Sequence, residues 1–337
     1  MRAIFLLLSL SAALTPALYA DDGASSIAAG GIIVMKREPL IVMAKEVLNI
    51  SPSRVLVDYD FRNDSDEDIT TEVAFPVPAY TLAWDERNPK EESFDDFKLW
   101  IDEEPARFTT EIRAFAGKHD ITELLSKLHV DASSFGHFDS GFNPKNPQQD
   151  PHSPDIDRLS KEQRTQLISA KAFPSEADRE PRWSVQKKYH WTQTFPAHSV
   201  VHIRHQYTPV LGNSNTIGNP AVYQGKDAVP EYAQSCPAAT LRDTLTKVWQ
   251  SDKDHESSPL SISYVSFILT TANTWKTPIE DFTLIVERPR IPKYKTYVSF
   301  CWDGPVTQLD ADHFSAHITG LVPKKELMIG YIWDDRR

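Results

Sequence analysis

Apolar and polar side chains alternate along residues 54–75, and a polar segment over residues 62–68 divides this stretch. The positions that share one face are Val55, Val57, Tyr59, Phe61, Ile69, Thr71, Val73 and Phe75. A period of two is typical of a strand that buries one face. The pattern therefore predicts two half-buried strands that pair as a hairpin around the polar turn.

The same alternation returns after residue 182. Its apolar face consists of Trp183, Val185, Tyr189, Trp191 and Phe195. A turn at 196–198 leads to another alternating run over 201–207, and further strands are expected at 41–50, 97–101, 108–112, 260–271, 281–287, 295–302, 313–319 and 326–333. The fold class that follows is mainly β, with sandwich-like antiparallel sheets in one or two β domains and a few inserted helices.

Helical spacing occurs in three places. An apolar stripe at i, i+3, i+4 and i+7 begins at Ile121, with Asp120 as its expected cap. Ser160 and Gln163 predict the start of a second helix that runs to about residue 172, and a third helix is expected near 231–250. The proline-rich segment 131–157 between the first two is expected to be a loop.

The N-terminus has the order of regions that is typical of a secretory signal peptide. Met1 and Arg2 precede an apolar run, small residues follow, and the expected cleavage site lies between Ala20 and Asp21. The alternative is an uncleaved membrane anchor, but the run is shorter than the roughly 18 residues that span a bilayer. We expect a periplasmic or secreted protein with no transmembrane segment after cleavage.

These boundaries divide the chain into four parts. They are a signal peptide over 1–20, an N-terminal β-sandwich portion over 21–118, a helix–loop–helix insertion over 119–182, and a C-terminal β-rich portion over 183–337 with one helix near 231–250.

Charge and cysteine content narrow the range of functions to be expected. The 36 basic and 47 acidic residues give a net charge of −11, which is poorly suited to nucleic acid or anionic membranes. Cys236 and Cys301 are expected to form a disulfide in an oxidising compartment. Two buried thiols, or a catalytic cysteine, are the alternatives.

Several residues have a spacing that suggests metal binding. His198, His202 and His205 lie close together, but His205 should point to the opposite strand face from the other two. His313 and His317 share a face that the pattern assigns to solvent. Asp64, Asp66 and Asp68 have the spacing of a calcium loop. Isoleucine replaces the glycine expected at its sixth position, and phenylalanine replaces the glutamate at its twelfth, so a solvated turn is the better interpretation.

Catalytic signatures are weak. Asp139-Ser140-Gly141 matches a short aspartic-protease signature, but only once, whereas that chemistry needs two carboxylates. The sequence has no nucleophile elbow, zinc-protease motif, phosphate loop or dinucleotide fingerprint. We therefore assign no catalytic, cofactor-binding or metal-binding residue. The tryptophans at 183, 191, 275, 302 and 333 are expected to pack in the core, with an aromatic groove for sugar or peptide as the alternative.

Three stretches carry a family resemblance. They are GGIIVMKREPLIVMAKEVLNISPSRVLVDYDFRNDSDEDITTEVAFPVP at 30–78, TFPAHSVVHIRHQYTPVLG at 194–212, and ILTTANTWKTPIEDFTLIVERP at 268–289, together with Cys236 and Cys301. With these motifs the mature chain resembles a bacterial exported family, the domain of unknown function 4424. The resemblance implies export but no activity.

A weaker likeness, to the vault/inter-alpha-trypsin-type β domain, rests on Tyr59, Phe61, Asn63, Phe75, Pro76 and Pro78. It implies a β-sandwich for the N-terminal part, and fold alone does not fix function. We expect a non-enzymatic binding or accessory module for an envelope protein, peptide or glycan, with no cofactor. The alternative is an envelope hydrolase whose site is assembled from dispersed Asp, Glu or His.

Overall fold

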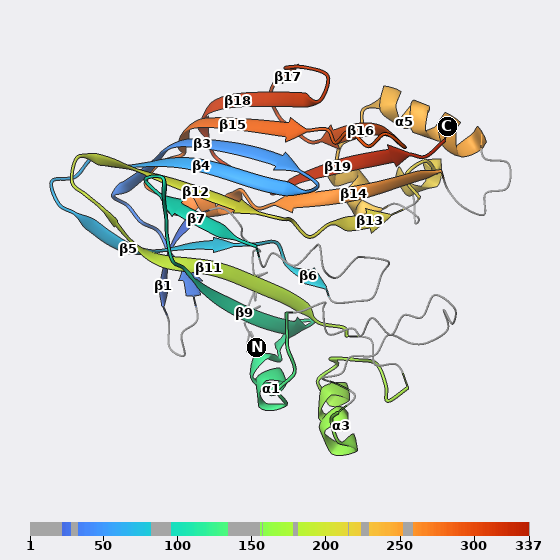
Figure 1. Ribbon diagram of the computed structural model, residues 1–337, viewed down its shortest axis with the longest axis horizontal. Coiled ribbons are helices and arrows are strands. Elements are labelled where there is room, and N and C mark those ends of the chain that lie inside the picture. The colour runs from blue at the N-terminus through green and yellow to red at the C-terminus, as the bar shows by residue number, and fades with distance from the viewer. Residues whose placement is uncertain are drawn as a thin grey trace, which may run out of the picture.

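The computed structural model describes residues 22–27, 33–81, 96–133, 156, 158–177, 181–214, 216–223, 229–251 and 259–336. Strands dominate these residues and form three sheets, with a few short helices at the periphery (Figure 1). The predicted mainly β fold class is confirmed. The four-part division of the chain stays a prediction.

The first sheet has seven strands in the order β10-β9-β11-β5-β1-β2, and β6 also pairs with β11. Every pairing in it is antiparallel. The strands are β1 Gly23–Ile27, β2 Ile33–Met35, β5 Ile69–Pro76, β6 Tyr80–Thr81, β9 Thr109–Ala116, β10 His119–Asp120 and β11 Ser184–Phe195.

The second sheet has eight strands in the order β17-β18-β15-β3-β4-β12-β7-β8. Among the strands that the structure describes, only β15 and β3 pair in parallel. The strands are β3 Ile41–Ser51, β4 Arg54–Asn63, β7 Lys98–Ile101, β8 Glu104–Pro105, β12 Ser199–Tyr207, β15 Ile279–Glu287, β17 Val306–Gln308 and β18 His313–Leu321.

The third sheet has four strands in the order β13-β14-β19-β16, namely β13 Gly212–Ser214, β14 Leu260–Phe267, β19 Leu327–Asp334 and β16 Lys295–Phe300. Its β19 reaches the second sheet, because the Tyr331 hydroxyl donates to the Ile50 carbonyl at 3.0 Å. The helices that accompany it are η2 Pro220–Tyr223, α4 Pro230–Gln234 and α5 Ala239–Ser251, and η4 Thr270–Thr274 follows β14. The strand predicted over 260–271 therefore ends at Phe267; residues 268–269 belong to no element, and 270–271 begin η4.

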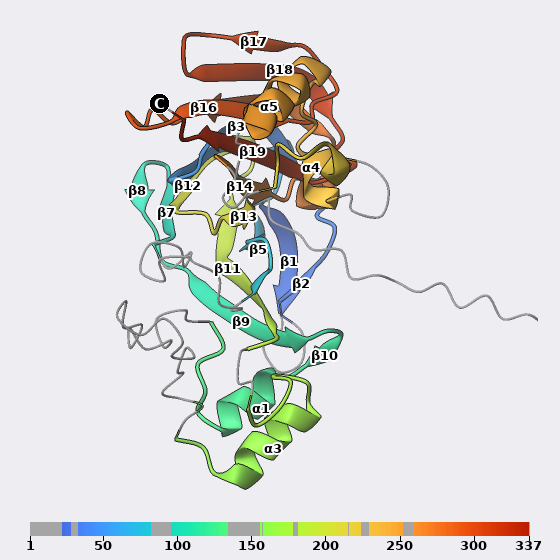
Figure 2. The same ribbon diagram turned by 90° about the vertical axis from the view of Figure 1, so that its right-hand side faces the viewer.

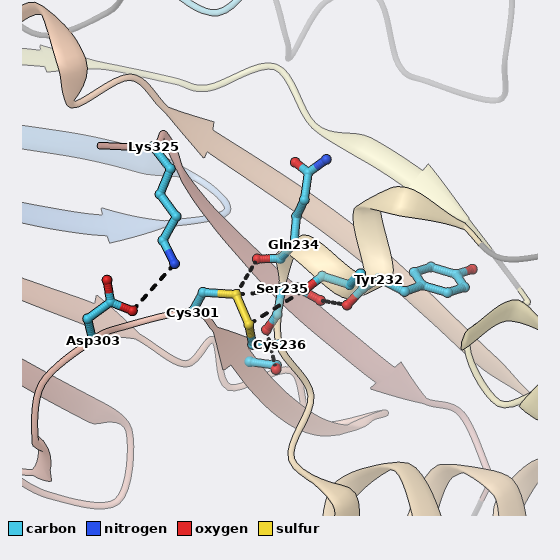
Figure 3. Close-up of a disulfide and its surroundings, with 9 residues drawn as sticks. Tyr232, Gln234, Ser235, Cys236, Cys301, Asp303 and Lys325 are labelled. Carbon is cyan, nitrogen blue, oxygen red and sulfur yellow. Dashed lines mark hydrogen bonds and ion pairs between the residues drawn. A yellow bond between two sulfur atoms is a disulfide. The ribbon is translucent and has the colours of Figure 1, made fainter. Parts of the chain in front are cut away.

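Two helices occupy the range 231–250 where the sequence predicts one. Pro237 lacks a backbone N–H and restricts the residue before it, and Cys236 has a positive φ of 47°. At this break, Cys236 forms a disulfide with Cys301, at a Cα–Cα distance of 5.0 Å (Figure 3).

The strands on either side of the polar segment 64–68 do not pair with each other. β4 belongs to the eight-stranded sheet and β5 to the seven-stranded sheet, so the predicted hairpin is wrong. The segment instead crosses from one sheet to the other, and residues 196–198 make the same crossing between β11 and β12. We call residues 62–68 and 195–198 the crossover turns. Alternation alone fits a hairpin and a crossover equally well, because both put the apolar faces inward.

The two sheets enclose one aromatic interior. Phe75 lies 4.8 Å from the ring of His205, and Phe97 stacks on Tyr189 with centroids 4.0 Å apart. The helices α1 Thr122–Lys127 and α3 Lys161–Ser169 lie beyond β9 and β10, at the far end of the molecule from α5 (Figure 2).

The first residues of the two helices differ in how well they agree with the caps predicted from the sequence. At α3, the Ser160–Gln163 capping box is present as predicted. At α1, the cap residue is Ile121 instead of Asp120, and Asp120 Oδ1 accepts a hydrogen bond from the Thr122 amide.

Candidate functional site

A cleft among the described residues lies at the point in the seven-stranded sheet where β1 ends but its neighbour β5 continues. β1 pairs with β5 only as far as Gly23 opposite Ala74, whereas β5 continues to Pro76. The cleft has a volume of about 910 Å³ and is lined by the end of β5, by β2 and the two residues after it, by β11, by η4 and by residues 323–326. Five segments that are distant in sequence therefore meet at one site.

The charge of this cleft is opposite to that of the whole chain. Six of its lining residues are cationic, namely Lys36, Arg37, Lys187, Lys188, Lys324 and Lys325. One is acidic, Glu326. Clefts concentrate the field of the charges that line them, so this lining favours a negatively charged ligand over a positively charged one, although the protein carries a net charge of −11. We call it the basic cleft.

Some of these cations have partners. Lys188 Nζ pairs with Glu111 at 2.9 Å, and Lys325 Nζ pairs with Asp303, two residues after Cys301, at 3.5 Å (Figure 3). Lys36 and Lys324 are exposed and form no ion pair with any residue that the structure describes. Positive charge is therefore in excess at the rim.

The floor of the cleft is more buried than its rim. Lys187 is 1% exposed, and its Nζ lies 5.8 Å from the centroid of the Tyr80 ring. Thr271 is also 1% exposed, and its hydroxyl forms no hydrogen bond within the described part of the chain. Burying an unbonded hydroxyl costs free energy, which a ligand that bonds to the hydroxyl would offset.

The single carboxylate is engaged in structure. Glu326 accepts hydrogen bonds from the Leu269 amide at 2.8 Å and from the Thr270 hydroxyl at 2.6 Å. It thereby ties residues 323–326 to η4. Among the described lining residues there is no histidine, no cysteine and no second carboxylate, so the arrangement is suited to holding an anion and lacks an acid–base pair.

The histidines of 198–205 do not converge. His205 is fully buried among aromatic rings, and burial lowers its pKa to about 3. His202 points to the other face, as predicted, with Nδ1 2.9 Å from Asp60. His198 lies in a crossover turn and contacts Asp66 at 2.9 Å.

The other candidate metal sites are equally dispersed. His313 contacts Asp310, and His317 contacts Asp281. No group of three or more potential metal ligands occurs within the residues that the structure describes.

The acidic turn over 64–68, predicted as a solvated loop, belongs to the first crossover turn and is hydrogen-bonded to the second. Asp68 Oδ1 accepts from the Ala197 amide at 2.8 Å, and buried Asn63 donates to the Phe195 carbonyl at 2.9 Å. Asp64 pairs with Arg62 at 2.7 Å. Each of these carboxylates therefore has a different partner, and they do not converge as the ligands of a calcium loop.

Trp183, Trp191 and Trp275 are at most 5% exposed and belong to the core, so they offer no surface for a sugar. Asp139-Ser140-Gly141, the cleavage site at Ala20–Asp21 and most of the predicted loop 131–157 lie outside the described residues.

Sequence reasoning missed the basic cleft, although a signal for it exists. The chain contains four adjacent pairs of Lys or Arg, at 36–37, 187–188, 324–325 and 336–337. The first three line the cleft. In an acidic chain such pairs could have been chosen as candidate anion contacts, but only the fold shows that they meet.

The comparisons identify a family but no function. The family model described as domain of unknown function (DUF4424) matches residues 20–329, so the chain belongs to this family. No curated protein matches the chain. No helix of the described residues has both the length and the hydropathy to cross a bilayer.

Two solved structures resemble the chain at low identity. A "putative nutrient binding protein" from Legionella pneumophila subsp. pneumophila str. Philadelphia 1 is 12% identical, with a TM-score of 0.39, and the match covers 92% of this chain and 72% of that one. An M1 zinc metallopeptidase from Deinococcus radiodurans is 8% identical, with a TM-score of 0.26, covering 88% of this chain and 43% of that one. At TM-scores this low, neither structure is evidence for the function of this chain.

Proposed function

Taking membership of this family as the premise, we propose that the chain is an exported, non-enzymatic binding module that takes an anionic ligand in the basic cleft. One observation carries the proposal: six cationic side chains and one carboxylate line a single cleft of an acidic protein. Unselected surface charge would give this cleft the acidic bias of the whole chain.

The chemistry of the lining favours binding over catalysis. Lysine and arginine supply donors and positive charge for carboxylates and phosphates. Hydrolysis by dispersed acids and bases needs titratable groups that converge on one reacting atom. Glu326 is the only carboxylate on the described lining, and it is bonded to η4.

Two features support export. The N-terminal apolar run has the form of a signal peptide. The disulfide between Cys236 and Cys301 is of the kind that persists in oxidising compartments. An envelope or extracellular location would expose the cleft to anionic peptides, glycans and metabolites.

The experiment measures anion binding by isothermal titration calorimetry at low salt, with inorganic phosphate, citrate and poly-L-glutamate as probes. The test variant is the double charge reversal Lys36→Glu/Lys324→Glu. The matched control is Lys98→Glu/Lys161→Glu, which changes net charge equally at exposed positions outside the cleft.

We expect at least one probe to bind the wild type, to lose about tenfold or more in affinity in the test variant, and to change less than twofold in the control. The expected loss corresponds to about 1.4 kcal/mol. Equal losses in both variants would mean that only net charge matters. That result, or no binding of any probe, would overturn the proposal.

A further inference from the structure

The basic cleft also has an apolar part, and it lies deeper than most of the positive charge. Five lining residues are apolar, namely Val34, Met35, Pro76, Val77 and Pro323. Of these, Met35 is half-buried, and Val77 and the two prolines are buried. Four of the six cations are exposed, namely Lys36, Arg37, Lys324 and Lys325. The cleft therefore combines a charged rim with apolar surface below it.

The side chain of Met35 lies at the point where β1 ends. Gly23 is the first residue of β1, and a side-chain carbon added to it would clash with Met35 Cε and lie 3.2 Å from Thr271 Cβ. Met35 therefore covers Gly23 beside Thr271, a buried lining residue from η4. Because methionine is unbranched and flexible, it can adapt its conformation to an apolar ligand.

One side of the cleft is preformed. Asn273 in η4 donates from Nδ2 to the Pro323 carbonyl at 2.9 Å. The carboxylate of Glu326 accepts from the Thr270 hydroxyl at 2.6 Å. These two bonds fix the segment 323–326 against η4, so a ligand need not order this side of the cleft in order to bind.

We propose that the ligand is a single-chain anionic amphiphile, with a carboxylate or phosphate head at the exposed cations and its alkyl chain over Met35. This inference rests on the proposed function and names its ligand class. Burial of the chain would provide affinity in proportion to the apolar area removed from water. Charge-assisted hydrogen bonds from the rim would fix the position of the head.

The size of the cleft favours this ligand over a small inorganic anion. Its volume of about 910 Å³ lies near the upper end of the range for drug-sized ligands, about 300–1,000 Å³. A phosphate ion would fill little of this volume and would leave the apolar lining in water. The positive rim in turn disfavours a cationic amphiphile, because only an anion is attracted to the exposed lysines.

A hydrophilic polyanion such as poly-L-glutamate is the competing ligand, because it could also contact the rim. It would gain nothing from the apolar surface around Met35, so its affinity should not depend on that surface. The two ligand classes are therefore separated by a substitution at Met35 and by the length of an alkyl chain.

The test measures binding by isothermal titration calorimetry at low salt, with each amphiphile below its micelle-forming concentration. The probes are butanoate, octanoate, dodecanoate and dodecyl phosphate, and dodecyltrimethylammonium is the charge control. The test variant is Met35→Gln, which keeps the length of the side chain and makes its end polar. The matched control is Met328→Gln, at another half-buried methionine, which lies on β19 outside the cleft. Urea denaturation verifies that both variants are folded.

Complete burial of one CH₂ group would raise affinity about fourfold. Allowing for partial burial, we expect affinity to rise at least tenfold from butanoate to octanoate, and at least tenfold again to dodecanoate. Dodecyltrimethylammonium should bind at least tenfold more weakly than dodecanoate. Dodecanoate and dodecyl phosphate distinguish the two head groups, and the inference requires that at least one of them binds.

The variants place the chain and the head. Met35→Gln should weaken dodecanoate binding at least fivefold and change citrate binding less than twofold. Met328→Gln should change neither by more than twofold. The double reversal Lys36→Glu/Lys324→Glu should weaken both dodecanoate and citrate about tenfold.

Three results would overturn the inference while leaving anion binding in place. They are an affinity that does not depend on chain length, equal binding of dodecanoate and dodecyltrimethylammonium, and undiminished dodecanoate binding by Met35→Gln. In each case, citrate binding that is weakened by Lys36→Glu/Lys324→Glu would still support the proposed function. Failure of every anion to bind overturns both.

Discussion

The crossover turns and the basic cleft both gather charged side chains, but they treat charge in opposite ways. At the turns, Arg62 pairs with Glu280 and Asp64, and Asp66 pairs with His198. At the cleft, Lys188 and Lys325 have acidic partners, but Lys36 and Lys324 at the rim form no ion pair with any described residue. Charged groups at the turns are bonded to each other or to the main chain and tie one turn to the other, whereas the proposed function leaves the unpaired cations at the rim of the cleft for a ligand.

The largest effect that separates the two regions is expected from Asn63→Ala in the crossover turns. Asn63 is fully buried, and its amide donates to the Glu67 and Phe195 carbonyls at 2.8 and 2.9 Å. Removing it leaves buried main-chain groups unbonded, which should lower the free energy of unfolding by about 3 kcal/mol. Urea denaturation measures this loss.

The matched control for that change is Asp66→Ala, because Asp66 is almost fully exposed in its pair with His198. It should alter stability by less than about 0.5 kcal/mol. Neither change should affect anion binding at the cleft. If Asn63→Ala weakened binding in the folded protein, the two regions would be coupled and the comparison would fail.

A smaller effect is expected from the titration of His205 in the interior between the two sheets. Burial lowers its pKa to about 3 in the folded state, from about 6.5 when unfolded. The unfolded chain therefore takes up the proton first, and stability falls as pH decreases through this range. Asp22, also fully buried, lies with its Oδ2 3.5 Å from His205 Nε2.

Between pH 7 and 5 this group alone should lower the free energy of unfolding by about 2 kcal/mol. His205→Gln should remove that dependence, and His202→Gln on the outer face should retain it. Because His205 does not line the cleft, citrate affinity corrected for citrate's own protonation should stay nearly constant over the same range. A wild-type stability that is flat from pH 7 to 5 would contradict the assignment.

The sequence predicts the interior of this fold better than its connections or its binding site. The inward positions of β4 and β11 follow from alternation because burial acts on each residue separately. Pairing partners depend on distant strands, so alternation could not tell the crossover at 64–68 from a hairpin. The cleft depends on five segments meeting in space, and only the three basic pairs marked it in the sequence.

The smallest effects come from neutralising one cation in each region. Arg62→Gln removes two contacts of 2.8 Å to Glu280, a partly exposed pair, and should lower the free energy of unfolding by about 1 kcal/mol. Lys324→Gln removes an exposed cation that has no ion pair with a described residue and lies among other positive charges. Without ligand, the free energy of unfolding of the Lys324→Gln variant should stay within about 0.3 kcal/mol of wild type or rise slightly.

The two variants should rank in the opposite order when the measured quantity is the stability gained on anion binding. A saturating anionic probe stabilises the folded state in proportion to the logarithm of its concentration relative to Kd. Lys324→Gln should therefore gain less stability from poly-L-glutamate than the wild type, while Arg62→Gln gains as much. Urea denaturation with and without the probe measures both gains. If the two variants gained equally, Lys324 would be ordinary surface charge, and the contrast between matched charge at the turns and available charge at the cleft would be lost.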